Sequence, residues 1–369
     1  EMVGAPASRA FALGRQALVI LLRAIGVRKG DRVGVCGFTC LSVVEAVKDC
    51  GAVPVYLDID ETLCISPEAI GRCRPGSLRA VLLQHTLGFP GKLDELLSAC
   101  AAIGADVIED CAHAMGCFWK RKRLGQFGLG AIYSFQWEKP YTTGQGGMLT
   151  VNSASLLARV EEEITRWAVP LSRADDWKLE CQRRIHSLLK AFGLETRARN
   201  HWHWFGSGDV PEELQDLTDA FLLYPGCIQP AGERMSAAGL SRLKDWPRIQ
   251  QIRRDNVALI CEAFARAGLP LWPVPPEADC TLLRYPLLMA RKAEILAEAR
   301  RNNLDIAGWY HSPVHPLPPQ ILAQVDYRAG DCPQSESLIA RLVHIPTGTG
   351  LRRKTLDRIV GLLAAKERL

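Results

Sequence analysis

Short apolar segments alternate with amphipathic helical segments over residues 11–135, and this alternation constrains the fold more than any other feature. Apolar runs bounded by turn residues predict buried strands, whereas apolar residues spaced three and four apart predict helices. The predicted strands cover residues 32–36, 53–59, 78–85, 107–110 and 131–135, and the predicted helices cover 11–25, 41–50 and 92–103, with another helix opened by Ser66 and Pro67. The pattern predicts an α/β fold in which helices cover both faces of a mostly parallel sheet.

Two of these predicted strands deliver reactive side chains to one edge of the sheet. The strand at 107–110 ends in Asp110, and the strand at 131–135 contains Ser134 and leads to Lys139. Ligands of open α/β sheets bind outside the carboxyl ends of the strands, so an acid and an amine are expected there together. The sequence TTGQGG at 142–147 follows, and its glycines allow the backbone to approach a ligand closely.

An acid and a lysine at neighbouring strand ends suit pyridoxal phosphate. This cofactor needs a lysine amine for its Schiff base and a carboxylate that keeps its ring nitrogen protonated. Each residue alone has a simpler interpretation, a lysine on a surface turn and an acid at a loop, because most such side chains are exposed. The order of the residues along the chain favours the cofactor over this alternative.

A candidate anion-binding turn lies near the start of the chain. Gly14, Arg15 and Gln16 lie near the start of the predicted helix at 11–25, for which Ser8 is the candidate cap. The N–H groups at a helix N-terminus bind anions, and Arg15 adds a positive charge. The turn is therefore a candidate phosphate site, and an exposed arginine on a first helical turn is the alternative.

Four motifs in this order and spacing resemble a known family. They are IEDCAHAMG at 108–116, G-x-F-G at 125–128, SF-x-x-x-K at 134–139 and TTGQGG at 142–147, and they are similar to those of the DegT/StrS-type sugar aminotransferases, which use pyridoxal phosphate. The resemblance implies the aspartate-aminotransferase-like fold (fold type I). It also implies a large cofactor-binding domain over residues 1–230 and a smaller C-terminal α/β domain over residues 231–369.

The resemblance assigns a role to each matching residue. Lys139 would hold the cofactor covalently, and Asp110 would pair with its ring nitrogen. His113 would lie against the ring and its phenolic oxygen. Ser134 would hold the phosphate together with the turn formed by residues 14–16. A branch of the same family that acts as dehydratases has histidine in place of the lysine, so Lys139 favours an aminotransferase.

The chain departs from the family at several of these positions. Arg15 replaces a threonine and Gln16 an alanine, which leaves the backbone of the turn as its contribution to phosphate binding. Cys40 occupies the place of an aromatic residue that packs on the cofactor ring. Phe38 and His85 are candidates to replace that aromatic residue, with a core position and a structural histidine as the alternatives.

Two further departures concern the neighbouring subunit and a loop. Gly232 replaces the asparagine of an Asn-x-Arg-Met-Ser segment that reaches the cofactor of a neighbouring subunit in the family. Leu129 replaces an aspartate. These losses leave room for another hypothesis, a regulatory or binding protein built on a former enzyme scaffold.

The rest of the chain is predicted to be helical and then mixed. Helical patterns are predicted over 156–167, 181–191 and 234–267, the last interrupted at Pro247, followed by strands at 282–289 and 342–346 and helices at 292–302 and from 355. The mixed basic and aromatic residues at 199–204 could line a substrate entrance, stack on a base or sugar, or anchor a loop. The basic run at 120–123 fits a solvated hairpin tip better than a nucleic-acid patch.

Composition limits the partners and the cellular compartment expected for this chain. A net charge of +5 over 369 residues permits an anionic substrate without requiring nucleic acid. The 13 cysteines are scattered and contain no CxxC pair, which indicates a reducing cytoplasm rather than a disulfide framework or a zinc site. No apolar run of about 18 residues is present, so no membrane span is expected.

The sequence thus predicts an aminotransferase that uses pyridoxal 5'-phosphate. The resemblance implies glutamate as amino donor, a keto sugar on a nucleotide as acceptor, and a homodimer with active sites at the interface, in the synthesis of polysaccharides or antibiotics. Keto cyclitols and other natural-product ketones stay open as acceptors. Nucleic acid, membranes and metals are not expected as partners.

Overall fold

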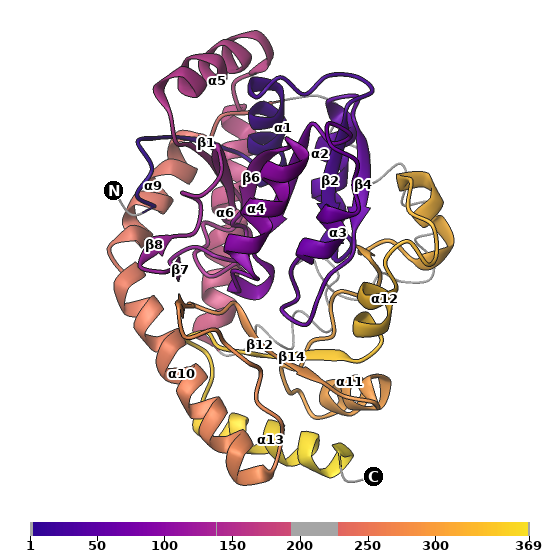
Figure 1. The fold of residues 1–369 in the computed structure, drawn as a ribbon. Helices are drawn as coiled ribbons and strands as arrows, with labels where there is room; N and C mark the ends of the chain where they lie inside the picture. Colours follow the sequence, from indigo (N-terminus) through magenta and orange to yellow (C-terminus); the bar gives the residue numbers. More distant parts are fainter. Residues whose placement is uncertain (1–2, 138, 193–227, 368–369) are drawn as a thin grey trace.

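The computed structural model describes residues 3–137, 139–192 and 228–367. Its centre is a seven-stranded sheet, around which the helices lie (Figure 1). The strand order is β1-β10-β9-β6-β5-β2-β4. These strands are β1 (Ala7–Phe11), β2 (Arg32–Cys36), β4 (Val53–Leu57), β5 (Ala80–Gln84), β6 (Asp106–Asp110), β9 (Gly130–Ser134) and β10 (Gly147–Val151). The five strands from β9 to β4 are mutually parallel, whereas β10 is antiparallel to both of its neighbours. The predicted parallel sheet is confirmed.

Helices cover both faces of this sheet, because successive residues of the strands point to opposite faces and are apolar on both. Along β5, Ala80 and Leu82 pack with one group of helices, and Val81 and Leu83 pack on the opposite face. The first face carries α1 (Gly14–Ala24), α2 (Leu41–Asp49) and α5 (Ala154–Trp167), and the second carries α3 (Pro67–Gly71) and α4 (Leu93–Ile103). A sheet buried on both faces is typical of parallel α/β folds.

The start of the chain differs from the prediction. Ser8 lies within β1, whose residues pair with β10, so it does not cap α1. The N-cap residue is Leu13, in an extended conformation. The alternating exposure of residues 7–11 is a strand pattern, and it extends the sheet beyond its parallel part. By contrast, Ser66 is the cap expected from the sequence, since its hydroxyl accepts from the Ala69 N–H at 3.0 Å.

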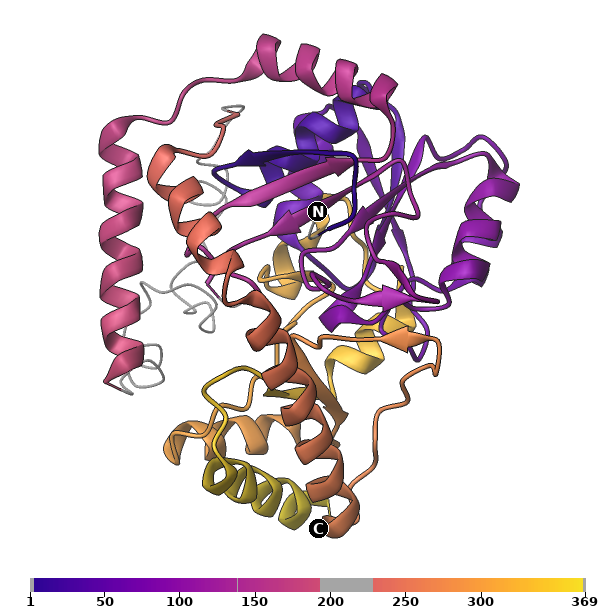
Figure 2. The ribbon, with the colours of Figure 1, turned by 90° about the vertical axis from the view of Figure 1, so that its left-hand side faces the viewer.

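The C-terminal part forms a smaller α/β layer, joined to the large sheet by a long helix (Figure 2). Its elements are α9 (Glu233–Leu243), α10 (Trp246–Ala267), β12 (Arg284–Leu288), α11 (Lys292–Arg301), η4 (Pro319–Val325), α12 (Pro333–Ile339), β14 (Leu342–Pro346) and α13 (Arg353–Glu367). Strands β12 and β14 pair antiparallel. At one end of α10 Trp246 packs on Tyr141, and towards the other Phe264 packs on Tyr285, so this helix ties the two parts together.

Two short strand pairs also connect the C-terminal part to the large sheet region. Strand β13 (Val314–His315) pairs parallel with β3 (Thr39–Cys40), and β11 (Ala278–Asp279) pairs with β7 (Phe118–Trp119). Strand β7 forms the predicted basic hairpin with β8 (Lys122–Arg123). These pairs place the segment around residue 310 next to residue 40.

Three remaining observations concern the sequence predictions. Helix α6 (Arg173–Ala191) extends the predicted helix at 181–191 and lies against α9, whereas residues 199–204 lie outside the described residues. All cysteines within the described ranges are free thiols. Within those ranges no helix is both long and apolar enough to cross a membrane.

Candidate active site

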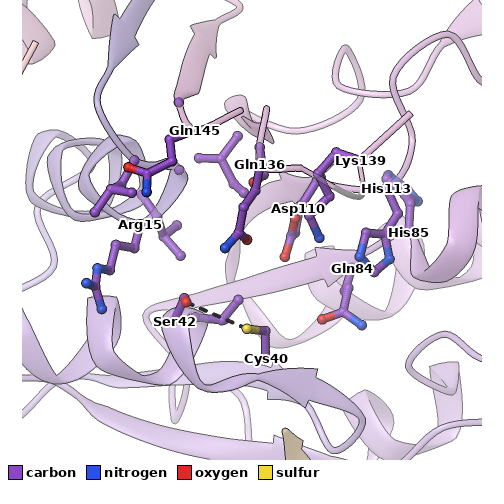
Figure 3. Close-up of a pocket in the computed structure, with 18 of the residues that line it drawn as sticks. Arg15, Cys40, Ser42, Gln84, His85, Asp110, His113, Gln136, Lys139 and Gln145 are labelled. Carbon is purple, nitrogen blue, oxygen red and sulfur yellow. Dashed lines mark hydrogen bonds between the residues drawn. The ribbon is translucent and has the colours of Figure 1, made fainter. Parts of the chain in front are cut away.

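A cavity of about 250 Å³ opens at the carboxyl edge of β5, β6 and β9, against the N-terminus of α1 (Figure 3). Six of the seven predicted site residues line it. They are Gly14, Arg15, Asp110, His113, Ser134 and Lys139. Residues that were not predicted also line the cavity, among them Gln84, Gln136 and Tyr310. The parallel sheet therefore brings the acid and the lysine into one cavity, as expected from their positions at strand ends.

Asp110 ends β6 and is buried, with 5% of its surface exposed. Its Oδ1 accepts from the Ala112 N–H at 2.9 Å, and among the described residues Oδ2 has no hydrogen-bond partner. Burial raises the pKa of this carboxyl, while the Ala112 N–H and the charges of Lys139 and His85 partly offset the rise. Such a carboxylate is suited to bind a cationic N–H inside the cavity.

His113 is held in one tautomer. Its Nδ1 accepts from the Leu87 N–H at 3.2 Å, so Nδ1 carries no proton and the neutral ring is protonated at Nε2. Burial lowers the pKa of His113 well below its usual value, and the nearby charges of Lys139 and His344 lower it further. His113 is therefore a neutral imidazole whose Nε2 can donate one hydrogen bond.

The turn that carries Lys139 is stabilised by its own backbone. Lys139 donates its N–H to the Gln136 carbonyl at 3.0 Å, and Thr143 donates to the Phe135 carbonyl at 3.0 Å. Gly144 and Gly146 have φ of 92° and 129°, values that favour glycine. The motif TTGQGG thus builds the turn that returns the chain from Lys139 into β10.

The N-terminus of α1 packs against the end of β9. A Cβ on Gly14 would lie 3.4 Å from Ser134 Cβ, and a Cβ on Gly147 would lie 2.3 Å from Gly14 Cα. Glycine at both positions lets the helix start, Ser134 and β10 meet. The hydrocarbon side chain of Leu13 cannot accept from the first N–H groups of the helix, which suits an anion in that place.

Arg15 and Gln16 differ in what they offer the cavity. Arg15 lines it and forms an ion pair with Glu45 of α2. Gln16 does not line it, because its side-chain oxygen accepts from the Leu13 N–H at 3.2 Å. Gln16 can therefore contribute only its backbone to an anion site.

Glu109, next to Asp110, serves the structure rather than the cavity. It is fully buried, and its carboxylate accepts from the N–H groups of Gly125, Phe127 and Gly128 at 2.7, 2.5 and 2.9 Å. His85 Nε2 lies 3.0 Å from Glu109 Oε2. These donors hold the pKa of Glu109 below its usual value although burial opposes them. The G-x-F-G motif is thus a backbone nest for Glu109, and this acid fixes His85 beside the cavity.

His85, Glu109 and Cys111 are close enough together to resemble a metal site. Their chemistry does not fit a metal ion. The Glu109 oxygens already accept from three N–H groups, and burial raises the pKa of the Cys111 thiol well above its usual value, so the thiol keeps its proton.

The comparisons with known proteins agree with this geometry. A model of the DegT/DnrJ/EryC1/StrS aminotransferase family matches residues 1–364. The chain belongs to this family. Two curated relatives are the L-glutamine:2-deoxy-scyllo-inosose aminotransferase of Streptomyces fradiae, 34% identical over 159 residues, and the GDP-perosamine synthase of Escherichia coli O157:H7, 35% identical over 147 residues. These matches cover 43% and 40% of the chain and 38% and 40% of the relatives. The chain spans about half, or less, of the length of the curated relatives it matches.

Solved structures of aminotransferases share the fold over nearly the whole chain. The aminotransferase PseC of Helicobacter pylori aligns with a TM-score of 0.76 at 17% identity, over 100% of this chain and 88% of that one. The sugar aminotransferase CalS13 of Micromonospora echinospora aligns with a TM-score of 0.73 at 20% identity, over 98% of this chain and 88% of that one. The predicted fold-type I architecture of this DegT/DnrJ/EryC1/StrS member is confirmed.

The structure explains one departure from the family pattern. Gly232 is the N-cap residue of α9, and Asp176 of α6 accepts there from the Arg234 N–H at 3.1 Å. A Cβ on Gly232 would lie 2.5 Å from Asp176 Oδ1. The carboxylate of α6 thus occupies the space that an asparagine at position 232 would need. For Leu129, which is 39% exposed, we have no structural explanation.

The residues near Cys40 show which aromatic group reaches the cavity. Phe38 is buried in the core and does not line the cavity, which excludes it as a ring partner. The Cys40 thiol lines the cavity 3.6 Å from the Ser42 hydroxyl. Tyr310, which the sequence predictions overlooked, lines the cavity as well. The ring of Tyr310 packs on Phe38, which lies far from it in the chain. No local sequence pattern could therefore identify Tyr310 as a residue of the cavity.

Proposed function

We propose that this chain is a pyridoxal-phosphate-dependent aminotransferase that transfers an amino group to a keto sugar. The observation that carries the proposal is that Lys139 and Asp110, from neighbouring strand ends, line one cavity. The names of the curated relatives, which act on an inosose or make GDP-perosamine, support the reaction class.

The residues of the cavity fit the cofactor at both of its ends. At one end, the uncapped N-terminus of α1, the Ser134 hydroxyl and the Arg15 guanidinium suit a phosphate. At the other end, Asp110 offers a buried acceptor for a protonated ring nitrogen. His113 offers a donor for an oxygen on the ring.

When bound, the cofactor supplies an electron sink that acidifies the C–H bond beside a substrate nitrogen. Lys139 Nζ would hold the cofactor, and as a free amine it would move the proton between that substrate carbon and a carbon of the cofactor, first as general base and then as general acid. Asp110 would keep the ring nitrogen protonated. The neutral His113 would donate from Nε2 without taking the proton that Lys139 needs, because its pKa lies far below the usual value.

We further propose glutamate as the donor and a nucleotide-linked keto sugar as the acceptor. The glutamine in the relative's name makes glutamine the competing donor, and its inosose makes a free cyclitol the competing acceptor. The homodimer, the division into domains at residue 230 and the cytoplasm as compartment also belong to this proposal. The free thiols of the described residues support the last.

The absorbance of the purified protein tests the reaction class. With pyridoxal phosphate the wild type should show the yellow band of lysine-bound cofactor, and an amino donor should bleach it. Lys139→Ala should lose the band, whereas Lys122→Ala on the exposed hairpin should keep it. Donors and ketones can then be ranked by how fast they bleach the band and restore it.

One outcome would replace this proposal by the regulator hypothesis. A wild-type protein that stays colourless in excess cofactor, but binds DNA with a steep dependence on salt, would be a binding protein on an enzyme scaffold.

A further inference from the structure

The segment 309–315 brings an aromatic ring from the C-terminal part to the cavity. Strand β13 pairs parallel with β3, and in this register His315 lies opposite Cys40 and Val314 opposite Thr39. Tyr310, five residues before His315, reaches the cavity that Cys40 also lines. Figure 3 shows Cys40 and Ser42 across the cavity from Asp110 and Lys139.

The ring of Tyr310 is held firmly in this place. It packs edge-on against Phe38 with ring centroids 4.7 Å apart, and it lies 5.1 Å from the ring of His315. Its backbone carbonyl accepts from Lys292 Nζ of α11 at 3.4 Å. With only 5% of its surface exposed, Tyr310 has a defined position before any ligand binds.

The hydroxyl of Tyr310 belongs to a side chain that lines the cavity. Among the described residues it has no hydrogen-bond partner. Burial raises the pKa of this phenol well above its usual value, and the nearby Cys40 and Asp110 raise it further, so the hydroxyl stays protonated.

We propose that Tyr310 is the aromatic residue that covers the cofactor ring on the side where Cys40 leaves it open. This inference rests on the proposed function, because it needs pyridoxal phosphate in the cavity. The small thiol at position 40 leaves space beside the ring, and the aromatic group that borders this space comes from the other part of the molecule. Aromatic rings pack favourably on one another in offset or tilted arrangements.

Cofactor affinity tests this inference without any turnover. The variants are Tyr310→Ala, Tyr310→Phe and the double variant Tyr310→Ala with Cys40→Phe, and the measurement is equilibrium dialysis of pyridoxal phosphate. Tyr310→Ala should weaken binding about three- to tenfold, the range expected for an aromatic pair. Tyr310→Phe should stay within about twofold, and Cys40→Phe should restore most of the affinity lost in Tyr310→Ala.

A matched control separates loss of the ring contact from loss of folding. Tyr56→Ala removes a tyrosine that packs on Tyr327 at 4.9 Å and does not line the cavity, so it should leave cofactor affinity unchanged. The circular dichroism of the bound cofactor should change in Tyr310→Ala and return in the double variant.

The outcomes distinguish this inference from the function on which it rests. If the wild type binds no pyridoxal phosphate, the proposed function fails. If the wild type binds it and Tyr310→Ala binds equally well, the assignment of Tyr310 is overturned. A weakened Tyr310→Ala that Cys40→Phe cannot restore would also overturn it, because the tyrosine would then support only the fold.

Discussion

Glu109 and Asp110 show how two adjacent acids take different roles. They follow one another on β6, so their side chains point to opposite faces of the sheet. Glu109 accepts from three N–H groups and pairs with His85, which lowers its pKa, whereas burial of Asp110 raises the pKa of that carboxyl. One acid stabilises the loop of the G-x-F-G motif, and the other is available to a ligand.

At the residue scale, His113 should make stability depend on pH. Its folded pKa lies well below its unfolded value of about 6.5, so the unfolded chain binds a proton first as the pH falls. The stability that neutral His113 contributes is fully present above about pH 6.5 and is lost towards acid pH. Between pH 7 and 5 the free energy of unfolding should fall less steeply in His113→Gln than in the wild type. The two slopes should differ by up to about 1.4 kcal/mol per pH unit.

Urea unfolding at several pH values measures this slope. His311→Gln, which replaces an exposed histidine by the same residue, is the matched control for the substitution itself. Buried His344 has a lowered pKa as well and should leave a residual slope in His113→Gln. Equal slopes in the wild type and His113→Gln would contradict the prediction.

At the scale of elements, α6 and α9 depend on one another through a cap. Asp176 of α6 accepts from the Arg234 N–H at the start of α9, and the Arg234 guanidinium lies 3.6 Å from the centre of the Trp177 ring. The cap crosses between helices, and the Asp176 carboxylate occupies the space that a side chain at position 232 would need. The two helices are therefore expected to unfold together.

Replacing Gly232 by Asn tests this dependence. Gly232→Asn should cost about 1–3 kcal/mol of stability, because the new Cβ would meet the Asp176 carboxylate at 2.5 Å. Asp176→Ala should cost about 1 kcal/mol through loss of the cap. The double variant should be about 1 kcal/mol more stable than the sum of the two single losses predicts, since the asparagine then has space and can cap α9 itself.

Denaturant unfolding of the four proteins completes this double-mutant cycle. Strictly additive losses would show that Gly232 and Asp176 do not share one space.

At the scale of the whole molecule, the cavity joins two parts of the chain. Asp110, Ser134 and Lys139 come from the large sheet region, whereas Tyr310 comes from the C-terminal part. The apolar core on one face of the sheet continues through α10 into β12 and β14. A ligand in this cavity contacts both parts and should stabilise them as one unit.

Thermal unfolding with and without pyridoxal phosphate measures this coupling. At a free concentration of about 100 times its dissociation constant, the cofactor should add about 2.7 kcal/mol to the free energy of unfolding. The whole calorimetric transition should shift upward, because both parts contact the ligand. A second transition whose midpoint temperature does not change with the cofactor would show that the C-terminal part does not take part in binding.

The sequence by itself determined the five parallel strands of the large sheet and the placement of the acid and the lysine at one edge, but it missed the outer strands β1 and β10. Apolar residues recur along a buried strand or helix with a short period. Segments such as 80–84 and 93–103 can therefore be predicted from the local sequence. Asp110 and Lys139 could be placed together because parallel strands bring their carboxyl ends to one edge. The backbone contribution of the turn at residues 14–16, expected from the helix N-terminus and the family resemblance, stays a prediction.

Only the tertiary structure decided the contacts between distant segments. The cavity lined by both Tyr310 and Cys40, the Asp176 cap at Gly232 and the nest around Glu109 each join residues that no periodic pattern relates. Ser8 belongs to β1 for the same reason, since its partner strand lies about 140 residues later. Such pairings depend on which surfaces meet when the chain packs, and this is a property of the folded whole.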